Sequence, residues 1–136
     1  LSLRRQRQMC IRDSLYTYAG DDFMGREAGT EGEDVAINYL KNEYESMGID
    51  GGMPDGAYFM PMTLNSYREN RTLEASNVLA FIEGSEIPNE ILVITAHLDH
   101  IGVEEDGQIN NGARYGYWWV CSLTRYPFLH KKRHRP

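Results

Sequence analysis

The pattern of apolar and polar residues predicts one α-helix in the first third of the chain. Apolar residues recur there at intervals of three and four positions, which places them on one helix face. That face consists of Val35, Ala36, Tyr39, Leu40, Tyr44 and Met47. The helix is expected to begin after Thr30, with Glu33 completing a capping box. It is expected to end at Gly48, which suits the left-handed C′ position, with Ile49 folding back against the last turn.

Three apolar runs further along the chain have the length and composition of β-strands. The first, residues 58–64, contains Pro61, which favours an edge position because proline cannot donate to a ladder. The other two, residues 76–82 and 90–96, are apolar nearly throughout, so we expect both of their faces to be covered. The short link 84–89 between them suits a hairpin-like connection.

A helix followed by a mixed sheet predicts an α/β fold. Residues 15–19 are expected to end a further helix, and residues 21–29 to form a loop punctuated by glycine. The chain has 136 residues, which is enough for one domain with a modest core. It contains no run of 18 apolar residues, so no transmembrane segment is predicted.

Charge divides the chain into three blocks. Residues 1–14 hold four Arg and one Asp, a net charge of +3, and residues 114–136 hold six basic residues and no acid, a net charge of +6. Residues 15–113 hold four basic and nineteen acidic residues, a net charge of −15. The two cysteines, Cys10 and Cys121, lie one in each basic end, so neither a disulfide framework nor a thiolate zinc cluster is predicted. We therefore expect residues 15–113 alone to form the folded domain.

The two basic ends are expected to be foreign to that domain. Residues 5–13 look like translated sequencing-library adapter, so residues 1–14 are interpreted as a non-native segment. The abrupt change between Ala113 and Arg114 favours a frame-shifted or chimeric tail over residues 114–136. The alternative is that the ends bind nucleic acid, through a basic arm or through tail aromatics that stack on a single strand. That alternative is weaker, because the arm has no interleaved aromatic residues and the tail has no apolar periodicity.

The residues best suited to chemistry lie where the last predicted strand ends. The apolar run 91–95 is followed two residues later by His97, and Asp99 lies two positions further on. Alternation along an extended segment returns Asp99 to the side of His97. A carboxylate in that place fixes the tautomer of a metal-binding imidazole and raises its basicity. The plainer alternative is a buried, hydrogen-bonded pair, but open α/β sheets gather ligands at the carboxyl ends of their strands.

Three other polar groups are not expected to bind a metal. His100 would point to the opposite face of the extended segment, which suits packing or support of a ligand. Residues 104–107 contain three acids and end in an Asp-Gly turn signal, which is typical of a solvated loop tip. His130 and His134 are four residues apart, but they lie among Lys and Arg side chains that repel a cation.

Three segments carry motifs in a specific order. Residues 76–85 contain Asn-Val followed by Ile-x-Gly, residues 92–102 contain His-x-Asp, and residues 110–113 read Asn-Asn-Gly-Ala. Together they resemble the cocatalytic two-zinc exopeptidases of the aminopeptidase Y and bacterial leucyl aminopeptidase type, metallopeptidase family twenty-eight. Residues 23–30 and the capped helix are in keeping with the opening of that family. A bare His-x-Asp is a weak signal, but in this order the motifs are specific. The resemblance covers residues 15–113, under half of a complete family domain.

The resemblance implies a truncated zinc exopeptidase fold, with a mixed, mostly parallel sheet flanked by helices. It implies two Zn²⁺ ions in the complete domain, with His97 as a ligand of one ion and Asp99 as the residue that orients His97. Family members continue after Gly-Ala into Asp-Asp-x-x-Ser-Gly, whose carboxylate bridges both ions, whereas here Tyr115 stands at that position. The paired Glu and the later Asp and His ligands lie beyond the end of this chain, so at most a weak partial zinc site is expected.

By resemblance, the parent protein is expected to be a zinc aminopeptidase, a hydrolase that removes N-terminal residues from peptides and has no nucleic-acid partner. Two zincs would activate a bridging water, polarise the scissile carbonyl and stabilise the oxyanion. The chain in hand is expected to be inactive because most of these ligands are missing. Bacterial members are often exported, so a periplasmic or secreted location is expected. The alternatives are a non-catalytic relative that uses its surface for binding and, with less support, a nucleic-acid-binding protein acting through its basic ends.

Overall fold

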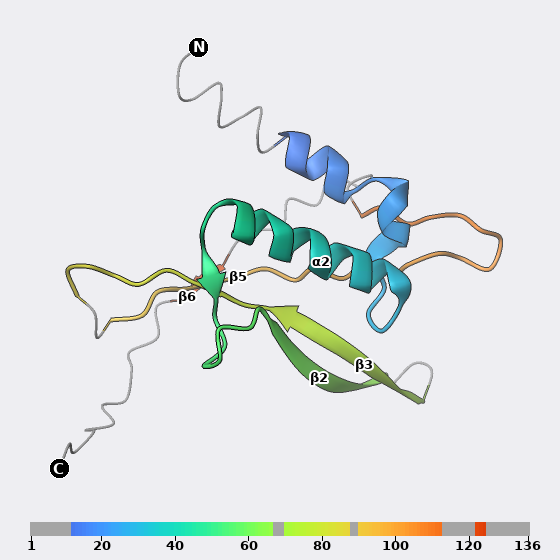
Figure 1. The fold of residues 1–136 in the computed structure, drawn as a ribbon. Helices are drawn as coiled ribbons and strands as arrows, with labels where there is room; N and C mark the ends of the chain where they lie inside the picture. The colour runs from blue at the N-terminus through green and yellow to red at the C-terminus, as the bar shows by residue number, and fades with distance from the viewer. Residues whose placement is uncertain (1–11, 67–69, 88–89, 113–121, 125–136) are drawn as a thin grey trace. The chain divides into compact units, whose positions relative to one another are not determined.

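The computed structural model describes residues 12–66, 70–87, 90–112 and 122–124. A helix over residues 12–18 precedes η1 (Asp21–Arg26), α2 (Glu31–Ser46), β1 (Asp50–Gly51), β2 (Phe59–Ser66), β3 (Arg71–Val78), β4 (Ala80–Phe81), β5 (Val93–Thr95) and β6 (Ser122–Thr124) (Figure 1). The chain divides into two units, residues 1–81 with 98–117 and residues 82–97 with 118–136. Apart from residues 12–14 and β6, the two basic ends, with Tyr115, His130 and His134, lie outside the described residues.

Helix α2 confirms the helix predicted from the apolar stripe, but its capping contacts differ from a capping box. Thr30 is the N-cap, and its Oγ1 donates to the carbonyl oxygen of Glu27 at 2.7 Å. The carboxylate of Glu33 accepts from the N–H of Gly29 rather than from that of Thr30. It also accepts from the N–H of Ser76 at 2.9 Å. The predicted box is wrong in its partners because this carboxylate joins the helix to β3.

The C-terminus of α2 matches the prediction in detail. Gly48 has a φ of 68°, the left-handed conformation expected of a C′ glycine. Its N–H donates to the carbonyl of Glu45 at 3.0 Å, and the N–H of Ile49 donates to the carbonyl of Tyr44 at 3.0 Å. These two bonds form a Schellman motif, which satisfies carbonyls that the end of the helix would otherwise leave without a donor.

The core of the described residues is small and lies between α2 and η1. Its buried apolar side chains are those of Phe23, Ala36 and Ile37, which are 5%, 0% and 6% exposed. The predicted stripe missed Ile37 and included Val35 and Met47, which are 37% and 59% exposed. The buried face is displaced because η1 packs against α2 around Gly32, whereas residues 45–48 at the end of the helix are exposed.

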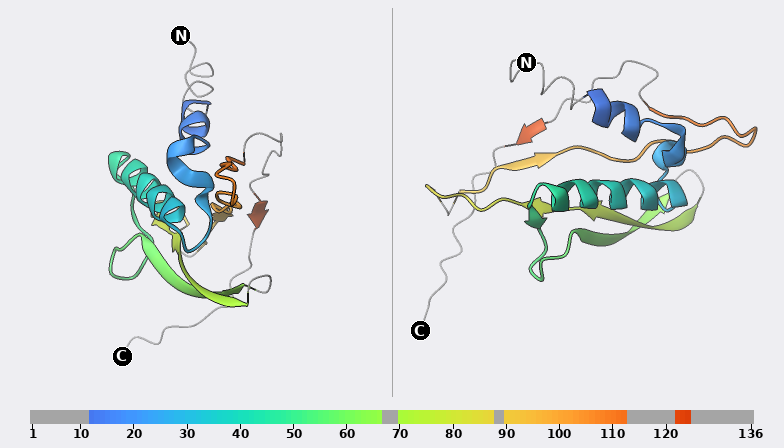
Figure 2. Two further views of the ribbon diagram at one scale, coloured as in Figure 1. Left: turned by 90° about the vertical axis from the view of Figure 1, so that its right-hand side faces the viewer. Right: turned by 45° about the horizontal axis from the view of Figure 1, so that its top comes forward.

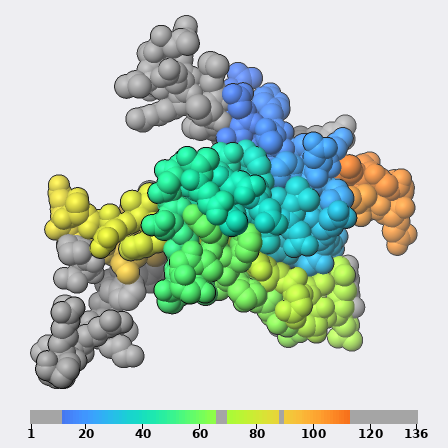
Figure 3. Space-filling view, viewed as in Figure 1, coloured from blue at the N-terminus to red at the C-terminus, as the bar shows by residue number. Residues whose placement is uncertain are grey.

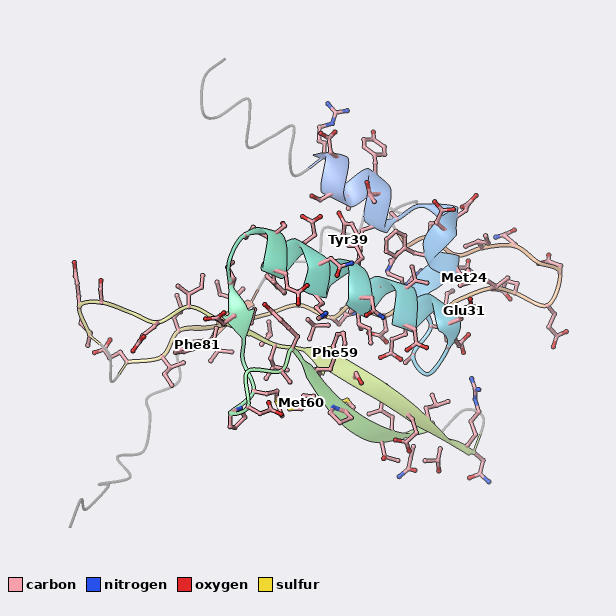
Figure 4. The ribbon with its side chains drawn as sticks, viewed as in Figure 1. Met24, Glu31, Tyr39, Phe59, Met60 and Phe81 are labelled. Carbon is pink, nitrogen blue, oxygen red and sulfur yellow. The ribbon has the colours of Figure 1, made fainter. Side chains whose placement is uncertain are left out.

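Three aromatic rings extend this core toward the N-terminal helix. The ring centroids of Tyr18 and Phe23 are 5.2 Å apart, and the ring of Tyr39 meets Phe23 edge-on at 5.4 Å. Tyr39 projects from α2 on the side of η1 (Figure 4). Tilted and edge-to-face arrangements of this kind are the ones that aromatic quadrupoles favour. The helix over residues 12–18 confirms the helix end predicted at residues 15–19.

The predicted mixed, mostly parallel sheet is wrong. The described strands form three separate two-stranded sheets, and each of them is antiparallel: β1 with β4, β2 with β3, and β5 with β6. In this part of the chain, parallel pairing is limited to an isolated bridge between Glu27 and His100. Parallel strands need a long crossover connection, but β2 ends at Ser66 and β3 already begins at Arg71. In each view α2 lies beside the β2–β3 hairpin (Figures 1 and 2).

The strands also differ from the predicted runs in extent and burial. The strand predicted at residues 58–64 is present as β2, in which Pro61 pairs with Ser76. The run 76–82 is divided between β3 and β4, and β3 alternates between exposed and half-buried positions rather than being covered on both faces. The run 90–96 contains only the short strand β5, whose three residues are exposed. The predicted hairpin link is wrong as well, since β4 pairs with β1 and β5 with β6.

Among the residues that the structure describes, no helix has both the length and the apolar character needed to cross a membrane.

Candidate functional site

His97 and Asp99 lie immediately after β5, as the pattern predicts. The strand ends at Thr95, two residues before His97. Both side chains are exposed, so the alternative of a buried pair is wrong. His97 belongs to the second unit of the chain and Asp99 to the first. The proposed roles of this pair stay predictions.

A buried arginine joins three segments of the first unit. Arg26 is 7% exposed, and its guanidinium donates three hydrogen bonds to backbone carbonyls. Nε donates to Leu98 at 3.1 Å, Nη1 to Tyr18 at 2.6 Å, and Nη2 to Asn111 at 3.2 Å. Residues separated by 72 and 85 positions from Arg26 are thereby held to η1.

Backbone hydrogen bonds hold the same segments together. The N–H of His100 donates to the carbonyl of Arg26 at 2.9 Å, and the N–H of Gly102 donates to that of Gly25 at 3.1 Å. The N–H of Asn110 in turn donates to the carbonyl of Gly102 at 2.9 Å. The segment after Leu98, drawn in orange toward residue 112, therefore lies next to the blue η1 segment (Figure 3). We name residues 98–102 and 110–112 the docked segment.

The backbone of η1 has an unusual conformation where the docked segment meets it. Met24 and Arg26 have φ values of 46° and 50°, the left-handed region that costs energy for residues other than glycine. Gly25 lies between them, and a Cβ atom there would collide with the carbonyl oxygen of Gly102 and lie 2.8 Å from that of Asn110. Only glycine lets the two backbones approach so closely.

The Asn-Asn-Gly-Ala motif ends the docked segment beside Arg26. The side-chain Nδ2 of Asn111 donates to Asp21 Oδ1 at 2.6 Å. Gly112 has a φ of 76°, and a Cβ atom there would lie 2.9 Å from Nη2 of Arg26. The asparagine thus anchors the segment to η1, and the glycine permits contact with the guanidinium. Ala113 lies outside the described residues.

Burial shapes the electrostatics around Arg26. Its guanidinium lies 4.9 Å from the ring centroid of Tyr18. Burial lowers the pKa of Arg26 below its ordinary value, and Tyr18 and Asp99 act in the opposite direction. Burial also raises the pKa of the Tyr18 phenol well above its ordinary value, against the attraction of Arg26. Among the described side chains, the buried Tyr18 hydroxyl and Asn111 Oδ1 lack a hydrogen-bond partner.

The acidic loop at residues 104–107 is the solvated turn that the sequence predicts. Gly107 has a φ of 84°, and its N–H donates to the carbonyl of Glu104 at 2.9 Å. Asp106 Oδ1 accepts from the N–H of Gln108 at 2.9 Å, and the three acids are exposed. The N–H of His100 pairs with η1, while its side chain is half-buried, as expected of a packing role.

No complete metal-binding group is present in the described ranges: no three His, Cys, Asp or Glu side chains lie close enough to hold an ion. An open hollow of about 550 Å³ along α2 is lined by Phe23, Glu31, Asp34, Val35, Asn38, Tyr39 and Asn42. Its lining includes none of the motif residues and no imidazole or thiol.

Sequence reasoning missed Arg26 and Gly25 as parts of the site. The loop over residues 21–29 was predicted only as a glycine-punctuated connection, because its partners lie more than 70 positions away. The available signal was that Arg26 is the only basic residue among residues 15–40, a stretch that holds six acidic residues. Comparison with protein families, with curated proteins and with solved structures finds no match to this chain.

Proposed function

We propose that residues 15–113 are the N-terminal part of a zinc exopeptidase domain that removes N-terminal residues from peptides. In this proposal His97 is a ligand of one Zn²⁺ and Asp99 orients its imidazole. The proposal rests on the ordered motifs of the sequence. Residues 1–14 and 114–136 are proposed to be foreign to the domain.

One observation carries the proposal furthest. Leu98, the residue between His97 and Asp99, and Asn111, in the Asn-Asn-Gly-Ala motif, both accept a hydrogen bond from one guanidinium through their carbonyl oxygens. Two motifs far apart in the sequence therefore lie within the span of a single side chain. This adjacency supports the proposal, since the resemblance places ligands of a shared metal centre at or just after these two motifs.

The described residues do not form a complete zinc site. An imidazole is a suitable zinc ligand, and a nearby carboxylate is the usual partner that fixes its tautomer. Catalytic zinc takes three protein ligands, however, and the described residues supply no such group. We therefore assign no catalytic step to this chain and propose that it is inactive by itself.

Zinc titration of the full chain tests the role of His97. We expect no tight site by calorimetry, and a weak site whose occupancy shifts the ring signals of His97 in NMR spectra. His97→Ala should weaken that site at least tenfold, whereas the control His100→Ala should leave it unchanged. Two tight sites in the chain, or a weak site indifferent to His97→Ala, would contradict the proposal.

An activity assay tests the assignment to exopeptidases. The 136-residue chain should not hydrolyse aminoacyl chromogenic substrates with or without zinc. A chain continued after Ala113 through Asp-Asp-x-x-Ser-Gly and the later ligands should be active, and His97→Ala should abolish that activity because the ligands act as a unit.

Sequencing the gene across the Ala113–Arg114 junction is a separate test. An alternate reading frame that encodes Asp-Asp-x-x-Ser-Gly would support the peptidase, and an intact frame would support a binding domain.

A further inference from the structure

We propose that Arg26 is a positioning residue that holds the peptide after His97 and the loop ending at Gly112 in fixed register. The part of this inference that concerns register rests on hydrogen bonds alone. The statement that the register serves a peptidase site rests on the proposed function.

The geometry requires a guanidinium rather than any cation. Three separate nitrogens donate to carbonyls of three segments, Leu98 at 3.1 Å, Tyr18 at 2.6 Å and Asn111 at 3.2 Å. A guanidinium is planar and presents its donors in a rigid fork. A lysine ammonium is a compact point charge on a flexible stem and cannot span the same carbonyls.

The contact is also costly to maintain, which argues against an incidental packing role. Arg26 is 7% exposed, so its charge is largely removed from water. Its own φ of 50° and that of Met24, 46°, lie in the left-handed region. Strained residues of this kind persist only where the surrounding structure holds them, and they cluster at functional sites. Here the surrounding structure is the docked segment itself.

Two glycines allow the backbone to come close to Arg26 and to η1. Gly112 lies so near the guanidinium that an added Cβ would be 2.9 Å from Nη2. Gly25 allows the backbone of η1 to reach Gly102. Arg26 therefore contributes both its carbonyl, which accepts from His100, and its side chain to the same interface. A side chain that only filled space would not make side-chain hydrogen bonds to the same segment that its own carbonyl binds.

NMR of the metal-free, ¹⁵N-labelled full chain tests the proposal. The amide N–H of Asp99 shares a peptide group with the Leu98 carbonyl, and the amide N–H of Gly112 shares one with the Asn111 carbonyl. Arg26→Lys should shift both amide signals and speed hydrogen exchange at the N–H of His100 at least tenfold. Exchange in the β2–β3 hairpin should change less than twofold. A merely structural role would not produce this local signature.

Arg71→Lys is the matched control, because Arg71 is exposed and makes an ion pair with Glu27 at 3.1 Å. It should leave the signals of Asp99 and Gly112 in place. Unmoved signals in Arg26→Lys would overturn the proposal, as would an equal rise of exchange throughout α2 and the hairpin.

A second variant guards against a general loss of folding. In Arg26→Gly, the glycine tolerates the left-handed backbone conformation of this position. The lost side chain leaves a space in which a small guanidinium compound can bind. Added ethylguanidinium should restore the Asp99 and Gly112 signals, whereas ethylammonium should not. Failure of rescue while the β2–β3 hairpin stays folded would overturn the proposal. These measurements contain no zinc, so their outcome is independent of the zinc titration of His97→Ala that tests the proposed function.

Discussion

At the residue scale, close backbone contact beside Arg26 depends on the absence of a side chain at particular positions. Gly112 combines a φ of 76° with contact to Nη2 of Arg26. Gly56 has a similar φ of 81°, but no heavy atom lies within 4 Å of where its Cβ would be. An alanine at Gly56 would be strained only by its backbone conformation, whereas an alanine at Gly112 would also collide with Arg26. Comparing the two substitutions therefore measures the effect of the collision.

Gly112→Ala is expected to loosen the docked segment. The methyl group would meet the guanidinium at 2.9 Å and the backbone would be strained, for a cost of about 1–2 kcal/mol beyond that of Gly56→Ala. Such a cost corresponds to roughly 5–30-fold faster exchange at the N–H groups of His100 and Gly102, measured by hydrogen exchange. Equal effects of the two variants on these amides would show that the contact with Arg26 does not matter.

The Tyr18 phenol is the second residue with a measurable consequence. Burial raises its pKa above the ordinary value of 10.0, so the folded chain retains a proton that the unfolded chain loses. The contribution of this group to stability is full below pH 10 and declines as the pH rises toward the folded-state pKa. Folding is therefore expected to weaken in alkaline solution through Tyr18.

An ultraviolet pH titration of the nine tyrosines checks this expectation. The phenols of Tyr18 and Tyr58, whose pKa values are both raised, should ionise late, and Tyr18→Phe should remove one phenol from that late step. Tyr16→Phe is the control, because Tyr16 is 70% exposed, and this variant should leave the late step in place. If Tyr18→Phe removes part of the ordinary step instead, the hydroxyl is not buried as described.

At the element scale, one carboxylate connects α2, the loop before it and β3. Glu33 is 6% exposed, and its two oxygens accept from the N–H groups of Gly29 and Ser76. It also lies in the first turn of α2, where the helix dipole favours a negative charge. The joint between helix and hairpin thus depends on a residue that would ordinarily serve only to cap the helix.

Glu33→Gln is expected to weaken this joint. A carboxamide has one acceptor oxygen, so its NH₂ group must face one of the two N–H donors, at a cost of about 1–3 kcal/mol. Hydrogen exchange at Ser76 or Gly29 should accelerate at least fivefold. Glu31→Gln, in the same helical turn but exposed, should have little effect. Unchanged protection at both amides in Glu33→Gln would contradict the bridging role.

At the scale of the whole molecule, the described residues bury few large apolar side chains. Several remain well exposed, including Ile82 at 73%, Leu92 at 64% and Ile94 at 61%. Stable domains of this size ordinarily bury most of such surface. The buried apolar side chains of the described residues, Phe23, Ala36 and Ile37, all belong to the first of the two units.

The purified chain is therefore expected to unfold without a sharp cooperative transition, to bind a hydrophobic dye and to have poor solubility. Calorimetry and dye fluorescence measure the first two. The double substitution Leu92→Gln and Ile94→Gln should reduce dye binding, whereas Val35→Gln with Met47→Gln, on the exposed part of α2, should reduce it less. A sharp two-state melt from a monomer would show that the chain has a complete core.

The sequence by itself determined the local features that depend on near neighbours. The extent of α2, the left-handed Gly48 and the turn at Gly107 were all predictable, because each follows from hydrogen bonds and backbone preferences within a few residues. The position of His97 after a strand was predictable for the same reason, since an apolar run ends there.

Tertiary structure alone decided the features that join distant segments. Several contacts depend on residues that lie tens of positions apart: the pairing of β1 with β4 and of β5 with β6, the second partner of Glu33, and the Leu98 and Asn111 carbonyls bound by Arg26. The pattern of apolar residues predicts which side chains will be buried. It does not predict which distant backbone groups will form the hydrogen bonds of a strand or of a buried side chain. An arginine with no local partner gives no such information either, because its hydrogen bonds exist only after the chain has brought three carbonyls together.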